Sequence, residues 1–221
     1  MYRFFRVNET FTTSTPLTGK AGMMRIALVP LLLAALPVSA QATTVEIGVR
    51  GANGKPLAGA VVFVDTANKP AAPIRFAWGT EMAQRNIAFD PHVLIVPTGS
   101  TVTFPNKDKV RHHVYSFSKV KAFNLKLYGR DQVPTVVFDK PGIVALGCNI
   151  HDSMSGFIVV ADTPFAMQTD AAGHVSIANV PAGGATLRLW HPSIRAPGNM
   201  LQQTVTIAPT GYSTTLVVRG K

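Results

Sequence analysis

The chain has a single cysteine, Cys148, among its 221 residues. One thiol cannot close an internal disulfide, so the protein does not belong to the small exported domains that disulfides hold together. Three interpretations remain for Cys148: an inert buried thiol, a link to another molecule, or a functional ligand or nucleophile. The neighbouring residues have to decide among them.

Long hydrophobic runs are also scarce. The longest, residues 26–38, is too short to span a bilayer, which takes about 20 apolar residues. Arg25 precedes this run and the small residues "VSAQA" follow it, as in a secretory signal. We therefore predict that residues 1–42 are a leader and signal peptide, cleaved after Ala42 or alternatively Ala40. The rest of the chain is expected to be periplasmic, with no stable membrane insertion.

Acidic residues are few, 11 against 21 lysines and arginines, which gives a formal charge of +10. A basic protein can bind nucleic acid, anionic lipid or an acidic protein. Export, the lack of an arginine-rich run and the lack of an aromatic stacking motif all argue against nucleic acid. Between residues 107 and 130 the bases are dense, which describes either a solvated face or a surface that steers an acidic partner. They are Lys107, Lys109, Arg111, Lys119, Lys121, Lys126 and Arg130.

Catalytic arrangements are absent from the sequence. It has no cysteine–histidine–acid nucleophile set, no second histidine cluster for a catalytic metal, and no paired carboxylates in a recognisable context. The acids are scattered singly, which suits solvated turns better than acid–base work. We predict that the protein is not an enzyme.

No amphipathic helix is evident after the leader. Short β-branched and aromatic runs alternate instead with clusters of Gly, Pro, Asn and Asp, a pattern typical of β-sandwiches. About a dozen such runs are too many for one sandwich of roughly 100 residues, so two β domains are expected. The runs are "VEIGV", "AVVFV", "VLIV", "TVTF", "HHVYSF", "TVVF", "IVAL", "GFIVV", "HVSI", "TLRLW", "TVTI" and "TTLVV".

Two segments far apart in the chain resemble parts of one known module. "VEIGVRGANGKPLAGAVVFV" (45–64) and "TDAAGHVSIANVPAGGATLRLW" (169–190) are similar to the opening and the middle of the carboxypeptidase-regulatory-like, or transthyretin-like, sandwich. The resemblance implies one discontinuous sandwich, residues 43–75 plus 164–221, with a second domain inserted. A tandem array of two short modules is the alternative.

The inserted stretch holds a compact set of possible metal ligands. Cys148 is followed by His151 and Met154 in a C-x2-H-x2-M spacing, and the strand-like run "GFIVV" comes next. Asn106 and Asp108 precede a pair of histidines in "HHV". A thiolate, two imidazoles and a weak thioether form the donor set of a type 1 copper site. Structural zinc sites favour four cysteines, or two with two histidines, so copper is the better match.

Residues 82–163 resemble a cupredoxin, the copper-binding Greek-key β-sandwich of plastocyanin and amicyanin. The resemblance implies one type 1 copper ion bound by His112, Cys148, His151 and Met154. Adjacent strand residues point to opposite faces, so only one histidine of the pair can face the metal, and the family pattern favours His112 over His113. Methionine also fills apolar gaps, which leaves a packing role open for Met154.

The sequence departs from the plastocyanin pattern at His113. Plastocyanins usually have asparagine directly after the first histidine ligand, where it helps to tie the ligand loops together, and His113 occupies that place here. We assign no role to the remaining histidines, His92, His174 and His191. The fold class we predict is all-β, a cupredoxin sandwich inserted in or flanked by a second small β-sandwich.

The resemblance implies a one-electron carrier, with His151 as the point where the electron leaves. The segment is similar to plastocyanin-like proteins of methylamine utilisation. We expect a redox partner protein, such as a cytochrome or a dehydrogenase, and an acidic partner is one option that the basic residues leave open. Two alternatives stay open: a copper-handling protein without a carrier role, and a structural module with a vestigial site. A trafficking site tends to be exposed and rich in Met or His, unlike this single compact loop.

Overall fold

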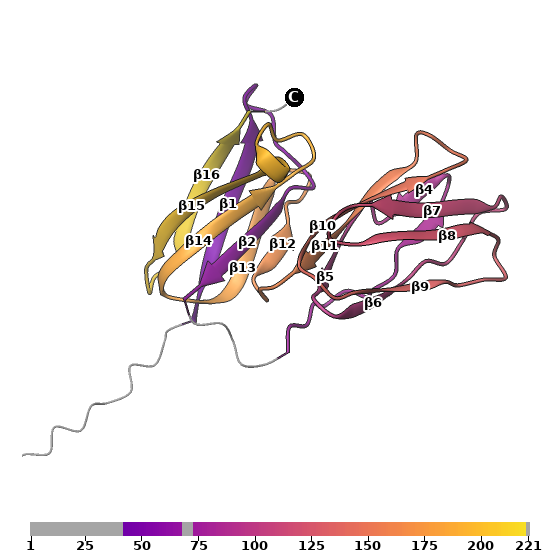
Figure 1. Cartoon of the computed structure of the whole chain (residues 1–221). Helices are drawn as coiled ribbons and strands as arrows, with labels where there is room; N and C mark the ends of the chain where they lie inside the picture. Colours follow the sequence, from indigo (N-terminus) through magenta and orange to yellow (C-terminus); the bar gives the residue numbers. More distant parts are fainter. Residues whose placement is uncertain (1–41, 68–72, 220–221) are drawn as a thin grey trace, which may run out of the picture. The chain divides into compact units, whose positions relative to one another are not determined.

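The computed structural model describes residues 42–67 and 73–219 (Figure 1). The described chain is all-β, as predicted, with one short 3-10 turn at Pro197–Asn199 and no α-helix among these residues. None of its elements is a helix long and apolar enough to cross a membrane. The predicted leader and signal peptide lie outside the described residues, apart from Ala42.

The strands form two groups, which we call the terminal sandwich and the central sandwich (Figure 1). The terminal sandwich contains β1 (Ala42–Gly51), β2 (Val61–Thr66), β12 (Ala166–Gln168), β13 (His174–Pro181), β14 (Gly183–Trp190), β15 (Met200–Ile207) and β16 (Tyr212–Val218). The central sandwich contains β3 (Ala83–Arg85), β4 (Ala88–Asp90), β5 (Val93–Pro97), β6 (Ser100–Thr103), β7 (His112–Phe117), β8 (Ala122–Tyr128), β9 (Thr135–Phe138), β10 (Gly142–Cys148) and β11 (Ser155–Ala161).

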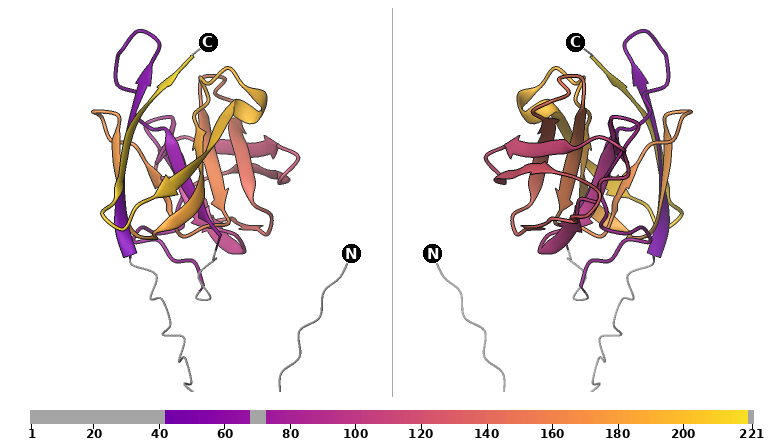
Figure 2. Two further views of the ribbon diagram at one scale, coloured as in Figure 1. Left: turned by 90° about the vertical axis from the view of Figure 1, so that its left-hand side faces the viewer. Right: turned by 90° about the vertical axis from the view of Figure 1, so that its right-hand side faces the viewer.

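The terminal sandwich is built from both ends of the described chain. Its sheets have the strand orders β13-β1-β16 and β12-β2-β14-β15, so β1 and β2 pair on both sides with strands more than a hundred residues away in sequence. Figure 2 shows β1 (indigo) beside β16 (yellow), with which it pairs in parallel. Whether residues 43–75 and 164–221 fold as a unit separate from residues 82–163 stays a prediction.

The central sandwich has a five-stranded sheet, β5-β11-β10-β7-β8, and two short pairs, β3-β4 and β6-β9. The metal-ligand candidates come from neighbouring strands of the larger sheet. Antiparallel pairing of β7 with β10 sets Val114 opposite Cys148 and Tyr115 opposite Gly147. This register brings the start of β7 next to the end of β10.

Three strands are buried on both faces, which explains their unbroken apolar runs. In β5, Leu94 and Val96 face the core of the central sandwich, whereas Val93 and Ile95 join a separate cluster with Trp190 of β14. Strand β11 divides its side chains in the same way, and so does β2 between this shared cluster and the core of the terminal sandwich. The shared cluster therefore packs strands of both sandwiches into one apolar layer.

Candidate metal centre

His112 is the first residue of β7 and is fully buried. Its Nε2 lies 2.9 Å from Oδ2 of Asp108, so the ring donates its Nε2–H to the carboxylate. That hydrogen bond leaves Nδ1 as the nitrogen with the free lone pair, which is the form that a metal-binding histidine needs. Nδ1 lies 3.8 Å from Sγ of Cys148.

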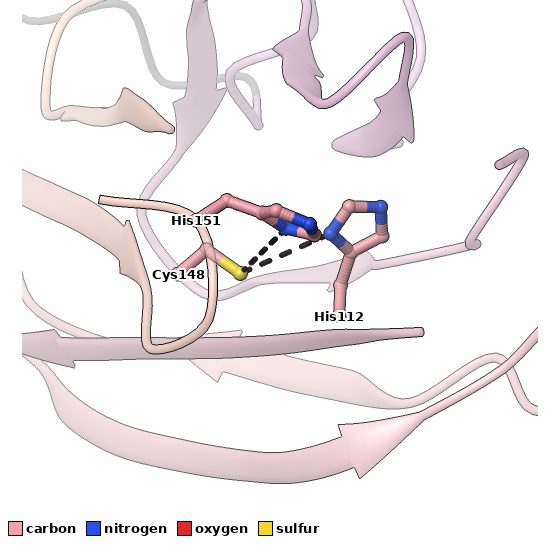
Figure 3. Close-up of side chains that lie close together, drawn as sticks. All are labelled: His112, Cys148 and His151. Carbon is pink, nitrogen blue, oxygen red and sulfur yellow. Dashed lines mark hydrogen bonds between the residues drawn. The ribbon is translucent and has the colours of Figure 1, made fainter. Parts of the chain in front are cut away.

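Cys148 ends β10 and is 3% exposed. Its sulfur also lies 3.7 Å from Nδ1 of His151, in the loop that joins β10 to β11. Figure 3 shows both imidazoles turned toward the sulfur. The ligand atoms of His112, Cys148 and His151 all lie within 4.8 Å of one another, the one group of three or more His, Cys, Asp or Glu with this proximity that the described residues contain.

These separations fit a single shared ion. A thiolate at about 2.3 Å and an imidazole nitrogen at about 2.0 Å, about 120° apart on one metal, lie about 3.7 Å from each other. The two sulfur–nitrogen distances, 3.7 and 3.8 Å, match this value. Each imidazole nitrogen is therefore spaced from the sulfur as two ligands of one ion would be.

Met154 closes the loop directly before β11. It is 2% exposed and belongs to the same apolar cluster as Cys148. Its amide donates to the carbonyl of His151 at 2.9 Å, which curls the loop back on itself and joins the two residues. The structure thus buries Met154 in the apolar cluster that also contains Cys148.

His113 points away from the cluster. It is only partly buried, and its Nε2 lies 2.7 Å from Oδ1 of Asn124 on the neighbouring strand β8. Alternation along β7 produces this outcome, because the even-numbered residues His112, Val114 and Ser116 are buried and the odd-numbered ones are not. His112 is therefore the histidine of the pair that faces Cys148.

The loops that carry the candidate ligands are tied together by backbone groups. The amide of Asn149 donates to the carbonyl of His113 at 3.0 Å. The side chain at position 113 is therefore not needed for this link.

The other histidines lie elsewhere and bind other groups. His174 pairs with Glu46 at 2.8 Å, His191 contacts Ser193, and His92 packs edge-on against Phe157. None of the three belongs to the cluster of His112, Cys148 and His151.

Asp108 is a functional candidate that sequence analysis noted only as part of a motif. Its carboxylate accepts from His112 and also from the amides of Asn86 and Ile87, at 2.7 and 3.0 Å. Burial raises the pKa of Asp108, but these hydrogen bonds outweigh burial and leave the pKa below its ordinary value. A charged carboxylate is thus held against His112, four residues along the chain. The signal for this contact in the sequence was that Asp108 lies four residues before His112.

Two buried contacts support the strands that carry the ligands. Gly147 lies beneath Tyr115, because a Cβ at position 147 would stand 2.8 Å from Cζ and Oη of that ring. Tyr128, opposite His112 on β8, donates from its hydroxyl to Oε1 of Gln84 at 2.6 Å, and burial raises its pKa. The tyrosine stays neutral and keeps this interior hydrogen bond.

Several solved structures resemble part of this chain. A purple cupredoxin from Nitrosopumilus maritimus is 23% identical over 38% of this chain and 100% of its own length, with a TM-score of 0.35. A copper-containing nitrite reductase from Thermus scotoductus is 25% identical over 44% of this chain and 28% of its own, with a TM-score of 0.37. A reduced Cu(I) form of an amicyanin variant is 21% identical over 45% and 98%, with a TM-score of 0.35.

No protein-family model and no curated protein matches the sequence. The structural likenesses are partial and their TM-scores low. The chemistry of the site is therefore inferred below from its own donor atoms.

Proposed function

We propose that the protein is an exported type 1 copper protein that carries single electrons between redox partners. The observation that carries the proposal is the buried thiol of Cys148, faced by Nδ1 of His112 at 3.8 Å and by Nδ1 of His151 at 3.7 Å. Met154, which is buried in the same apolar cluster as Cys148, would complete the set as the weak fourth donor.

The donor set favours copper over other metals. A thiolate with two imidazoles suits both copper and zinc, but a thioether is a soft ligand that selects copper. When bound, copper would supply the one-electron exchange between Cu(II) and Cu(I). The remaining work falls to the chain, which has to hold the donors in a fixed arrangement and exclude water.

The described residues meet both requirements. His112 and Cys148 are held on adjacent paired strands, and Asp108 fixes the ring of His112 through Nε2. Burial of His112, Cys148 and Met154 removes the site from water. His151 is only partly buried, which makes its ring the route by which an electron would reach the surface.

The experiment is an absorption and electron paramagnetic resonance titration of residues 43–221 with one equivalent of Cu(II). We expect an intense blue or violet thiolate band and narrow copper hyperfine splitting in the wild type, and loss of both in Cys148→Ser. His113→Gln is the matched control, because its ring faces Asn124, and it should keep the band. A pale, tetragonal spectrum that Cys148→Ser leaves unchanged would contradict the proposal.

A copper-handling role without electron transfer is the second candidate. It also predicts copper binding, so the two are separated by exchange kinetics. A carrier should exchange electrons rapidly between its own Cu(I) and Cu(II) forms and have a high reduction potential. Slow exchange with tight copper binding would favour handling. The prediction that the protein is not an enzyme stays open beside both candidates.

A further inference from the structure

One turn beside the candidate metal site carries much of the local positive charge. We call residues 107–111 the ligand turn, because it leads directly into His112. Asn106 holds it from inside: its amide nitrogen donates to the carbonyl of Val110 at 2.8 Å, and its side-chain oxygen accepts from the amide of Asp108. Arg130 donates to two carbonyls of the turn, both at 2.7 Å. These hydrogen bonds hold the backbone of the ligand turn in one conformation.

Three acids near the ligand turn are already engaged. The carboxylate of Asp108 faces inward to His112, Glu81 lies 3.7 Å from Lys107, and Asp90 lies 3.0 Å from Arg85. Lys109 and Arg111 are exposed, and no described carboxylate lies within 4.0 Å of either. Lys109 and Arg111 therefore carry positive charge that no carboxylate of the described residues pairs with, although the exposed Asp152 follows His151 in the chain.

Apolar side chains are exposed among these charges. Ile87 and Val110 are each 46% exposed and Ile150 is 48% exposed. Each is tied to the site: the amide of Ile87 donates to Asp108, Val110 lies in the ligand turn, and Ile150 directly precedes His151. Exposed apolar groups next to a charged rim are the usual composition of a transient protein–protein interface.

The opposite end of β7 differs from the ligand turn. A six-residue strand is about 20 Å long, so Lys119, which follows β7, lies well away from His112. Lys121, in the same turn, is paired with Asp139 at 3.3 Å, and Lys140 follows Asp139 in the chain. Lys119 and Lys140 are exposed and serve as a matched pair of distant charges.

We propose that Lys109 and Arg111, together with Ile87, Val110 and Ile150, form the docking surface for an acidic redox protein. This proposal rests on the proposed function as an electron carrier. The partner would present carboxylates around its own electron-exchanging group, which places that group close to His151. An anionic membrane fits less well, because two cations contribute only about 1 kcal/mol each at such a surface.

The test measures how fast two small oxidants of opposite charge oxidise the Cu(I) protein. Hexacyanoferrate(III) is the anionic probe, tris(phenanthroline)cobalt(III) is the cationic probe, and a polyglutamate peptide mimics the acidic partner. The variant Lys109→Glu/Arg111→Glu is compared with Lys119→Glu/Lys140→Glu, which makes the same total change in charge at the other end of β7.

In the wild type we expect the anionic oxidant to react faster at low salt, and polyglutamate to slow it. The ligand-turn variant should react about tenfold more slowly with the anionic oxidant, react faster with the cationic one, and lose the effect of polyglutamate. The distant variant should stay within about twofold of the wild type. Both variants should keep the copper spectrum of the wild type, which shows that each is folded and loaded.

Equal effects in the two double variants, or rates that do not depend on salt, would overturn the docking surface while leaving the carrier function intact. Wild-type protein that binds copper but exchanges electrons with neither oxidant would instead contradict the proposed function. Stable binding of the wild type to vesicles of anionic phospholipid, lost in the ligand-turn variant, would assign the surface to a membrane and overturn the choice of partner.

Discussion

The two sandwiches share one backbone architecture but differ in what they bury. The core of the terminal sandwich is rich in Val, Ile and Leu, and its buried polar residues are threonines. The central sandwich buries His112, Gln84, Asn106 and the thiol of Cys148 among similar apolar residues. Burying polar groups costs free energy unless each is hydrogen-bonded, and no buried side-chain nitrogen or oxygen among the described residues lacks a partner. The central sandwich thus carries polar groups that packing alone does not require.

The buried polar residues of the terminal sandwich are of a different kind. Thr169 accepts from the amide of Ala60 and donates to the carbonyl of Leu57, and Thr163 donates to the carbonyl of Val64. These hydroxyls satisfy backbone groups close to strand ends. An interior histidine and thiol that face each other are therefore candidate metal ligands, whereas the interior threonines satisfy backbone groups of the fold.

The largest expected effect comes from separating the two ends of the terminal sandwich. β1 and β2 each lie between two partner strands contributed by the C-terminal part of the chain. Expressed alone, residues 164–221 should therefore fail to fold, and residues 43–221 should show a cooperative unfolding transition by circular dichroism. If limited proteolysis released a stable fragment of residues 164–221, the discontinuous sandwich would be wrong.

The next largest effect is expected from adding a side chain at Gly147. In Gly147→Ala the new Cβ would lie 2.8 Å from the ring of Tyr115, and the strain should cost about 1–3 kcal/mol in the free energy of unfolding and displace Cys148. In the terminal sandwich Gly184→Ala should be nearly neutral, since nothing lies within 4 Å of its added Cβ. Urea unfolding and the copper spectrum measure both variants.

The substitution Tyr115→Ala tests whether the tyrosine ring causes the strain in Gly147→Ala. If the ring is the cause of the strain, Gly147→Ala should cost clearly less in the Tyr115→Ala background than in the wild type. Equal costs in the two backgrounds would place the strain elsewhere.

Removing the charge of Asp108 should affect metal binding more than stability. Asp108→Asn weakens the acceptor that orients His112, and we expect the affinity for Cu(II) to fall by about 10- to 100-fold. Competition with a chelator of known affinity measures this change. Asp139→Asn is the control, because that carboxylate is exposed and, among the charged side chains that the structure describes, forms an ion pair only with Lys121. A similar loss in both variants would contradict an orienting role for Asp108.

The smallest effect is expected from His191, which follows the last residue of β14. Its Nδ1 accepts from the amide of Ser193 at 3.2 Å, which is compatible only with an unprotonated Nδ1. Burial, and next the charge of His92, lower the pKa of His191. The neutral ring is thus preferred in the folded protein, while in the unfolded chain it protonates near pH 6.5.

Stability from His191 should therefore be complete above about pH 6.5 and be lost as the pH falls through the lowered pKa, by at most about 1.4 kcal/mol per pH unit. His191→Gln should flatten this part of the pH dependence of the unfolding free energy. An unchanged slope in His191→Gln would show that another group is its source.

Hydrophobic patterning predicted most of the strands. Each of the runs expected from the sequence overlaps a strand by at least four residues or, in "TVTF", by three, and "HHVYSF" coincides with β7. The strands that patterning missed are β3, β4 and β12, which have three residues each, and β8. β8 is interrupted at Lys126 by a positive φ of 59° and has no continuous apolar run, so its pairing with β7 fixes its conformation.

Residue type and spacing alone determined two features of this protein, its all-β class and the loop that joins Cys148, His151 and Met154. Strand periodicity and donor chemistry are local properties, legible in a short stretch of sequence. Only the tertiary structure decided that His112 faces Cys148, that Asp108 holds its ring, and that β1 lies between β13 and β16. Each of these depends on strand register and on contacts between distant segments, and a shift of one residue in β7 would turn His113 inward instead.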